Sequence, residues 1–237
     1  RLAECLAMPE QIYLAVDLGA SSGRVLAGLF DGRRLRLEEV HRFENGAVDL
    51  AGSLQWNVLG LWQHILTGLR AARSKYGDRI QSVGVDTWGV DFALLGRDDV
   101  LLGNPVSYRD KRTEGMMDRA IAQLGREEIF AHTGLQFMPI NTLYQFMGLK
   151  AQNSPWLEAA KSFLMIPDFF HWLLTGVKAN EVTNATTTQF FNPVRRGWAT
   201  ELLDKLQLPT HLLGPLVEPG TKLGKLRASI CAETGLA

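Results

Sequence analysis

Between residues 12 and 43 the chain shows the short apolar runs and the alternation of apolar and charged residues that are typical of β-strands. Apolar residues fill 12–16 and, after Arg24, positions 25–30, and leucine and valine are interspersed with charged residues over 35–43. Asp31-Gly32 separates the second run from the third, and this dipeptide is a strong hairpin signal. The pattern predicts three successive strands that form a meander rather than a βαβ unit.

A helical period follows over residues 57–76. Apolar residues recur at alternating steps of four and three residues, which places them in one stripe of an amphipathic helix. The members of this stripe are Val58, Trp62, Ile65, Leu69 and Ala72. Gly77 comes next and is the expected helix stop.

The rest of the chain alternates strand-like and helix-like segments. Apolar segments at 82–95, interrupted at 86–89, and at 163–166 predict strands. Helices are expected at 113–124, 126–132, 142–151, 168–174 and 229–235. This order predicts an α/β fold of the ribonuclease-H-like type, with a mixed β-sheet flanked by helices, because the first two connections are hairpins. We expect residues 1–10 to be an extension or a remnant of the expressed sequence, and residues 11–237 to form one domain.

Composition narrows the classes of partner. The 237 residues carry 25 Lys and Arg against 25 Asp and Glu, so no whole-protein field that would gather nucleic acid or anionic membrane is expected. No apolar run approaches the roughly 20 residues that span a bilayer. The two cysteines, Cys5 and Cys231, lie near opposite ends and offer no metal or disulfide framework, so we expect a reduced, cytoplasmic setting.

The segment 16–24 is the first candidate for chemistry. Asp17 follows a predicted strand, where a carboxylate could hold a hydrated Mg²⁺. Glycines and serines then make a tight turn whose N–H groups and hydroxyls could face phosphate oxygens, with Arg24 as a forked donor. The alternative is a plain hairpin turn whose Asp and Ser side chains satisfy local backbone groups.

Residues 84–92 form the second candidate. Asp86 and Asp91 bracket Trp88 and Gly89 inside a strand-like run. A glycine there often marks a bulge or a close approach to a ligand, and an indole offers a flat face to a sugar. On spacing alone, a bulged strand with a core tryptophan is the simpler interpretation. Segment 107–113, whose alternating charges precede a predicted helix, is a third candidate, and its alternative is a capped, solvated helix start. Segment 184–189 is either a hydroxyl-rich loop near a ligand or a polar turn that enters a strand.

These segments together resemble the FGGY carbohydrate kinases. Six stretches match in the family's order: 15–24, 41–43, 84–92, 108–110, 141–145 and 183–189. The resemblance implies an actin-like ATPase fold of two domains. It also implies ATP and Mg²⁺ as cofactors, with transfer of the γ-phosphoryl group to O1 of L-rhamnulose.

The resemblance also assigns residues to roles. It places Asp17 beside the metal, and Gly89 at the sugar with Trp88 as a neighbour. The residues that it assigns to the ATP phosphates are Ala20, Ser21, Ser22, Gly23 and Arg24.

The resemblance is incomplete at the catalytic base. Members of this family place that aspartate, in a His-Asp-Thr segment, beyond the position that corresponds to Ala237, and they carry the adenosine site in a second domain. We therefore expect no catalytic base in this chain, and a missing C-terminal kinase domain as its partner. The alternatives are a non-catalytic sugar-binding module, a kinase for a related ketose such as L-fuculose, or an actin-like ATPase with another role.

Overall fold

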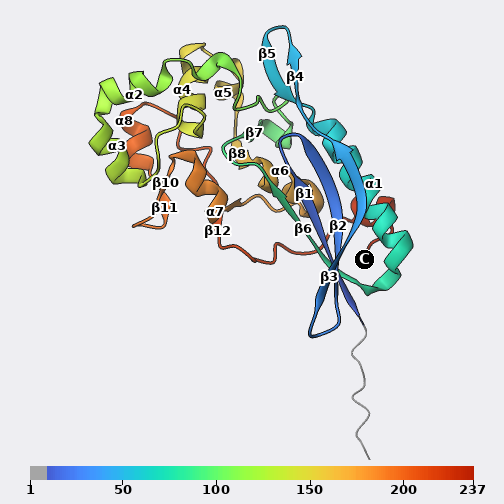
Figure 1. Cartoon of the computed structure of the whole chain (residues 1–237). Helices are drawn as coiled ribbons and strands as arrows, with labels where there is room; N and C mark the ends of the chain where they lie inside the picture. The colour runs from blue at the N-terminus through green and yellow to red at the C-terminus, as the bar shows by residue number, and fades with distance from the viewer. Residues whose placement is uncertain (1–9) are drawn as a thin grey trace, which may run out of the picture.

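The computed structural model describes residues 10–237, and its largest sheet has the predicted meander (Figure 1). The strands are β1 (Gln11–Leu18), β2 (Ser22–Phe30), β3 (Leu35–Glu44) and β6 (Ile80–Thr87), in the order β3-β2-β1-β6. The first three pair antiparallel, and β6 pairs parallel with β1. The predicted mixed sheet is therefore confirmed.

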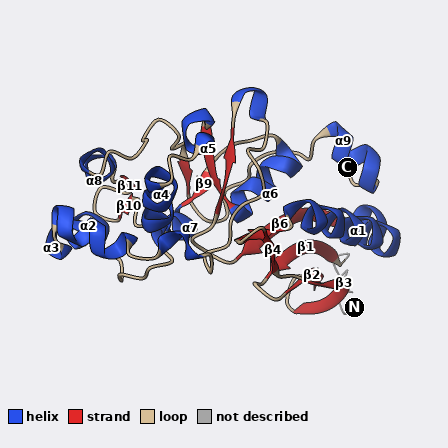
Figure 2. Ribbon diagram, turned by 90° about the horizontal axis from the view of Figure 1, so that it is seen from above, coloured by secondary structure: helices blue, strands red, loops and turns tan. Residues whose placement is uncertain are grey.

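Helix α1 (Val58–Tyr76) lies over one face of this sheet, as Figure 2 shows. The side chain of Asn57 caps its first turn, and Gly77 ends it at φ 60°. The helix comes so close to β2 that a Cβ atom on Gly68 would lie 2.3 Å from a methyl group of Val25. The predicted stripe and stop are both confirmed, and four of the five stripe residues are fully buried.

A second core lies in the more helical part of the molecule. Its centre is a group of aromatic rings, Phe146, Phe163 and Phe190, within 5.0–6.0 Å of one another. Strands β7 (Phe92–Leu95) and β8 (Ser162–Met165) pair antiparallel beside it. The helices of this part include α2 (Met116–Leu124), α3 (Arg126–Thr133), α4 (Thr142–Ala151), α5 (Pro155–Ala159), α7 (Val182–Ala185) and α8 (Thr200–Lys205).

The remaining elements connect the two cores or extend from them. Helix α6 (Ile166–Thr175) packs against β6, and α9 (Ala228–Thr234) against α1. The short strands are β4 (Ala47–Leu50), β5 (Ser53–Trp56), β9 (Asn180–Glu181), β10 (Phe191–Asn192), β11 (Gly197–Trp198) and β12 (Leu216–Val217). None of the helices within residues 10–237 combines the length and apolar character that a bilayer crossing requires.

The structure departs from the sequence-based predictions at element boundaries. Helix α2 begins at Met116, three residues later than predicted, because Lys111–Thr113 form a separate 3₁₀ turn. Strand β8 ends at Met165 because Pro167 belongs to the first turn of α6. The β4–β5 hairpin and α5 were not predicted. The proposed N-terminal extension, residues 1–10, lies outside the described residues except for its last position.

Candidate functional site

Two of the predicted site segments leave the sheet at the same edge. Because β1 and β6 are parallel neighbours, Leu18 at the end of one strand pairs with Thr87 at the end of the other. The turn that follows β1 (residues 19–21, the β1–β2 turn) and the loop that begins at Trp88 therefore start from adjacent positions. The fold thus brings together segments that are almost 70 residues apart in the sequence.

The β1–β2 turn is held by its own backbone and by one asparagine. The N–H of Gly19 donates to the carbonyl of Ser22 at 2.8 Å. Asn45, just after β3, donates its backbone N–H to the carbonyl of Ser21 at 3.2 Å and its side-chain amide to the carbonyl of Gly19 at 2.7 Å. The acceptors in these bonds are carbonyl oxygens of the turn, and the N–H groups of Ala20 and Ser21 take no part in them. An anion site needs N–H groups that are available as donors in this way.

Asn45 was missed by the sequence analysis. Asn45-Gly46 is a turn dipeptide at the end of β3, and such dipeptides are recognisable loop signals. The pattern says nothing, however, about the 26 positions that separate Asn45 from its partner Gly19.

Asp17 and Arg24 face each other across β1 and β2. They are register partners, and the guanidinium of Arg24 donates to one oxygen of Asp17 at 2.8 and 2.7 Å. Both side chains are about 40% exposed, at 39% and 42%. The cation predicted to meet phosphate is therefore paired with the carboxylate predicted to sit beside the metal.

The predicted phosphate segment divides into two parts. Ala20 and Ser21 form the turn, whereas Ser22, Gly23 and Arg24 belong to β2. Gly23 is buried, and a Cβ atom there would lie 2.4 Å from the ring of Phe43. Gly23 therefore allows the strand to pass under an aromatic ring.

The donor set around Asp17 suits a metal held mainly by water and phosphate. Asp86 is the register partner of Asp17 on β6, so two carboxylates leave adjacent strands on the same face of the sheet. Among residues 10–237 no group of three or more His, Cys, Asp or Glu side chains could hold a metal ion. Mg²⁺ at nucleotide sites commonly uses one or two carboxylates and completes its shell with waters and phosphate oxygens, so the residues present fit it.

The loop after β6 contains a strained turn. The N–H of Asp91 donates to the carbonyl of Gly89 at 2.9 Å, with Val90 between them at φ 67°. A β-branched residue rarely adopts positive φ, and such strain persists where neighbours enforce it. Here the N–H of Val90 donates to the hydroxyl of Thr187 at 3.0 Å, and its carbonyl accepts from Thr142 at 2.7 Å.

Thr187 brings the polar segment 184–189 to this loop. A Cβ atom on Gly89 would lie 3.1 Å from the Thr187 side chain, so the backbone of the loop and the threonine are in close contact. Segment 184–189 therefore lies beside the Trp88–Gly89 loop, and its role as a ligand-facing loop stays a prediction.

Three aromatic side chains gather next to this loop, and we call Trp56, Trp88 and Tyr108 the aromatic cluster. The rings of Trp56 and Trp88 have centroids 4.1 Å apart, and those of Trp56 and Tyr108 are 6.4 Å apart. Trp56 is fully buried, whereas Trp88 and Tyr108 are partly buried. Their indole and backbone N–H groups converge on Asp91.

Segment 107–113 is a capped start, as predicted, but it is not solvated, because Ser107, Arg112 and Thr113 are buried. The side chain of Asp110 accepts from the N–H of Arg112 at 2.9 Å and also from the N–H of Leu54 at 2.8 Å. Asp110 therefore joins the start of a 3₁₀ turn to the β4–β5 hairpin.

Three of the five histidines have structural partners. His41 and His64 contact each other at 3.2 Å, and the Nε2 of His171 accepts from the N–H of Val85 at 3.0 Å. Burial lowers the pKa of His171 and of His41. These contacts explain the three side chains without a catalytic role.

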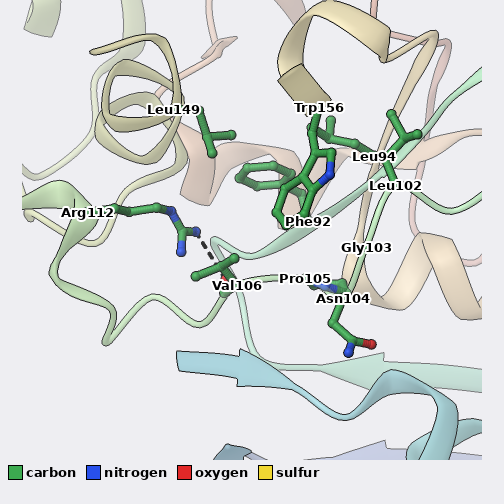
Figure 3. Close-up of a pocket in the computed structure, with 10 residues that line it drawn as sticks. All are labelled: Phe92, Leu94, Leu102, Gly103, Asn104, Pro105, Val106, Arg112, Leu149 and Trp156. Carbon is green, nitrogen blue, oxygen red and sulfur yellow. Dashed lines mark hydrogen bonds between the residues drawn. The ribbon is translucent and has the colours of Figure 1, made fainter. Parts of the chain in front are cut away.

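A pocket lies elsewhere, between β7, the chain at 102–106 and helices α4 and α5 (Figure 3). Its walls are mainly apolar, with Phe92 and Trp156 facing each other and Arg112 at one end. The space between these walls is narrow and partly open to solvent. None of the residues that the sequence analysis assigned to ATP, metal or sugar lines this pocket.

Comparison with known sequences identifies the chain's relatives. The profile of the FGGY family of carbohydrate kinases, N-terminal domain, matches residues 12–237. A rhamnulokinase of Oceanobacillus iheyensis is 44% identical over 227 residues, which are 96% of this chain and 48% of that protein. A rhamnulokinase of Halalkalibacterium halodurans is 45% identical over 222 residues, 94% of this chain and 47% of that protein. The chain spans about half the length of the curated relatives that it matches.

Solved structures show the same fold at low sequence identity. A gluconate kinase from Lactobacillus acidophilus superimposes with a TM-score of 0.86 at 17% identity, over 97% of this chain and 46% of that one. A ligand-bound xylulose kinase from the same organism gives 0.85 at 18% identity, over 96% and 46%. The predicted actin-like α/β fold with a mixed sheet is confirmed.

Proposed function

This chain belongs to the FGGY family of carbohydrate kinases, and on that premise we propose that it is the sugar-binding and phosphate-binding half of an ATP-dependent rhamnulokinase. The reaction is transfer of the γ-phosphoryl group of ATP to O1 of L-rhamnulose, in the cytoplasm. Relatives that are 44% and 45% identical carry the name rhamnulokinase, which favours L-rhamnulose over L-fuculose.

One observation carries the proposal most directly. The pairing of Leu18 with Thr87 starts the β1–β2 turn and the Trp88–Gly89 loop from adjacent strand ends. Phosphoryl transfer depends mainly on placing the phosphate and the acceptor hydroxyl side by side. A phosphate-binding turn next to a sugar-binding loop is the arrangement that this reaction requires.

The β1–β2 turn and its neighbours would bind the phosphates. The N–H groups and hydroxyls of Ala20, Ser21 and Ser22 would donate to phosphate oxygens, while Gly23 permits the tight path of the chain under Phe43. Arg24 would share its donors between Asp17 and a phosphate. Mg²⁺, bound with Asp17 and water, would neutralise negative charge on the transferring phosphates.

The Trp88–Gly89 loop would bind the sugar. Gly89 lets the backbone of the loop lie directly against Thr187, where a side chain would press on that threonine, and we infer that the peptide groups of this loop face the sugar. The partly buried ring of Trp88 would lie against the C–H groups of the sugar.

We assign the general base and the adenosine site to a second domain that is not part of these 237 residues. Two observations support this assignment: the chain corresponds to about half of its relatives, and no motif match makes Asp86, Asp91, Asp110 or Asp168 the base. The residues described here would therefore bind and orient substrates rather than remove the proton from O1.

Calorimetric titration of the chain with L-rhamnulose, with L-fuculose as competitor, tests the sugar assignment. We expect L-rhamnulose to bind more tightly, and Gly89→Val to abolish binding because its side chain would collide with Thr187. A chain that binds neither ketose would contradict the proposal.

A coupled assay for ADP tests the incomplete catalytic machinery. We expect the chain alone to give no sugar-dependent ADP above background. Turnover at kinase-like rates, about 1–100 per second, would refute the assignment of the base to another domain.

A further inference from the structure

Asp91 gathers hydrogen bonds from four segments of the chain. One carboxylate oxygen, Oδ2, accepts from the indole of Trp56 at 2.6 Å, the indole of Trp88 at 3.0 Å and the backbone N–H of Tyr108 at 3.1 Å. The other oxygen accepts from the side-chain amide of Gln145 at 3.1 Å. A single carboxylate therefore contacts every member of the aromatic cluster.

Burial of this carboxylate has a large energetic cost. Asp91 is 0% exposed, and an ionised group in such a place requires both donors and a counter-charge. The nearest counter-charge is Arg112, whose side chain is 5% exposed, donates to Gln145 and also forms an ion pair with Asp110 at 3.8 Å. Burial raises the pKa of Asp91, while the indole donors and Arg112 act in the opposite direction.

A purely apolar core would stabilise the fold without the cost of burying a charge. Stability alone therefore does not explain why a carboxylate is buried at this position. The two indoles donate to the same oxygen, which fixes the tilt of the rings at 37° with centroids 4.1 Å apart. Hydrogen bonds to an ionised acceptor are shorter and about twice as strong as neutral ones. The carboxylate thus selects one orientation of Trp88 relative to Trp56.

The same residue determines where the loop backbone lies. Asp91 closes the strained turn through its N–H bond to the carbonyl of Gly89. Its side chain then holds Trp88, so one residue sets the position of both the glycine and the tryptophan assigned to the sugar. Gln145 adds a bond to the carbonyl of Val90 at 3.2 Å, which links the loop to helix α4.

We propose that Asp91 is a positioning residue for sugar binding: its buried carboxylate orients Trp88 against Trp56 and fixes the Gly89 backbone, so that the sugar meets a preformed surface. This inference rests on the proposed function, because it takes the Trp88–Gly89 loop as the sugar site. Asp91 does not itself touch the sugar, since it lies entirely beneath the rings.

The test measures indole geometry and sugar affinity separately. Two stacked indoles give an exciton couplet in circular dichroism, and Trp56→Phe identifies the couplet of this pair. We expect Asp91→Ala to abolish the couplet and to weaken L-rhamnulose binding by about tenfold or more, the effect of losing bonds to a charged group. Asp91→Asn keeps an oxygen acceptor, so it should lie between the wild type and Asp91→Ala in both measurements.

Asp168→Asn is the matched control, since it also replaces a buried carboxylate by an amide but lies in α6 without contact to the aromatic cluster. We expect its couplet and affinity to equal those of the wild type. An Asp91→Asn variant that matches Asp168→Asn in both measurements would overturn the proposal, even if it is less stable. If Asp91→Ala does not fold, Asp91→Asn decides alone.

Different results would refute the proposed function and the positioning role of Asp91. A wild-type chain that binds no ketose refutes the proposed function. The couplet, measured without ligand, still shows whether Asp91 orients the indoles. An unchanged couplet in Asp91→Asn and Asp91→Ala refutes the positioning role whatever the sugar result.

Discussion

The β1–β2 turn and the aromatic cluster lie at the same edge of the sheet but are stabilised in different ways. The turn depends on backbone bonds, Asn45 and a half-exposed ion pair between Asp17 and Arg24. The cluster surrounds a carboxylate with no exposed surface, which is balanced by a buried arginine. One half of the candidate site is therefore open and locally built, and the other is buried and assembled from distant segments.

This difference suits the two ligands that we propose. Phosphates are highly charged and hydrated, and a turn with free N–H groups and exposed cations can receive them without a deep pocket. A neutral sugar offers C–H faces and hydroxyls, so recognition depends on well-placed rings and fixed polar groups. Rigid positioning of side chains is therefore more important for binding the sugar than for binding the phosphates.

The largest expected effect is the difference in stability between variants of Arg112 and Arg24. Arg112→Met should lower the free energy of unfolding by about 3–5 kcal/mol, because it leaves the charges of Asp91 and Asp110 without their shared counter-charge. Arg24→Met removes a pair that is about 40% exposed, so its cost should stay within about 1 kcal/mol. Urea unfolding of both variants measures the contrast.

A double variant tests the same difference between the two regions. Combining Asp91→Asn with Arg112→Met removes the more deeply buried of the two carboxylates that Arg112 compensates and should recover part of the lost stability. Equal costs for the two single arginine variants would show that the two regions do not differ as we describe.

The second effect concerns pH and a buried carboxylate with fewer partners than Asp91. Asp168 is 3% exposed, accepts one backbone N–H from Glu181 and has one oxygen without a partner. Burial, together with the nearby charge of Glu181, raises its pKa from 3.8 to about 7. The folded state then keeps a proton that the unfolded state loses, so this contribution to stability is complete below about pH 4 and is lost as the pH rises through about 7.

Asp168→Asn should remove that decline and stabilise the protein at pH 8 by about 1–4 kcal/mol relative to the wild type. Asp118→Asn is the control, because Asp118 is also in the first turn of a helix but is exposed. Thermal unfolding between pH 5 and pH 8 measures the stability of both variants. A wild-type stability that rises through this range, with no change in Asp168→Asn, would contradict the assignment.

The contrast between the two regions also explains what the sequence could predict. The meander, α1 and the turn after Asp17 follow from residues that are close in sequence, and all three elements are present. Trp88 and Gly89 interrupt an apolar run, so their segment was recognisable as unusual. The assignment of these residues to phosphate and sugar remains a prediction.

Long-range partners could not be predicted in this way. Trp56 reaches Asp91 over 35 positions, and Thr187 reaches Val90 over 97. Contacts between residues this far apart in the chain produce no periodic pattern in the sequence. The β4–β5 hairpin was missed because its turn is Ala51-Gly52, with φ of 53° and 86°, and alanine at positive φ is not a turn signal that the sequence reveals.

The third effect tests how tightly the open half is packed. Gly23→Ala would place a methyl group 2.4 Å from the ring of Phe43. That ring is buried and stacks on His64 at 4.4 Å, so it cannot move without cost. We expect a loss of about 1–3 kcal/mol.

Gly84→Ala is the control for Gly23→Ala. It lies on β6, and a Cβ atom there meets nothing within 4 Å, so we expect a change within about 0.5 kcal/mol. Equilibrium unfolding in urea compares the two. If Gly23→Ala costs no more than Gly84→Ala, close packing does not constrain this part of the site.

The smallest effect on stability should come from Asn45, although its effect on ligand binding is the more informative one. Asn45→Ala removes the bond from the side-chain amide to the carbonyl of Gly19, at a cost of about 0.5–1.5 kcal/mol. The freed carbonyl can then turn toward the space where an anion would bind, so the affinity for MgATP should fall by about threefold to tenfold. Asn192→Ala is the control, because Asn192 holds the N–H groups of Val194 and Arg195 in a distant turn. It should cost similar stability and leave MgATP affinity unchanged in calorimetry. Equal nucleotide affinities in the two variants would mean that the β1–β2 turn needs no support from β3, and that the open half of the site is even more local than its hydrogen bonds indicate.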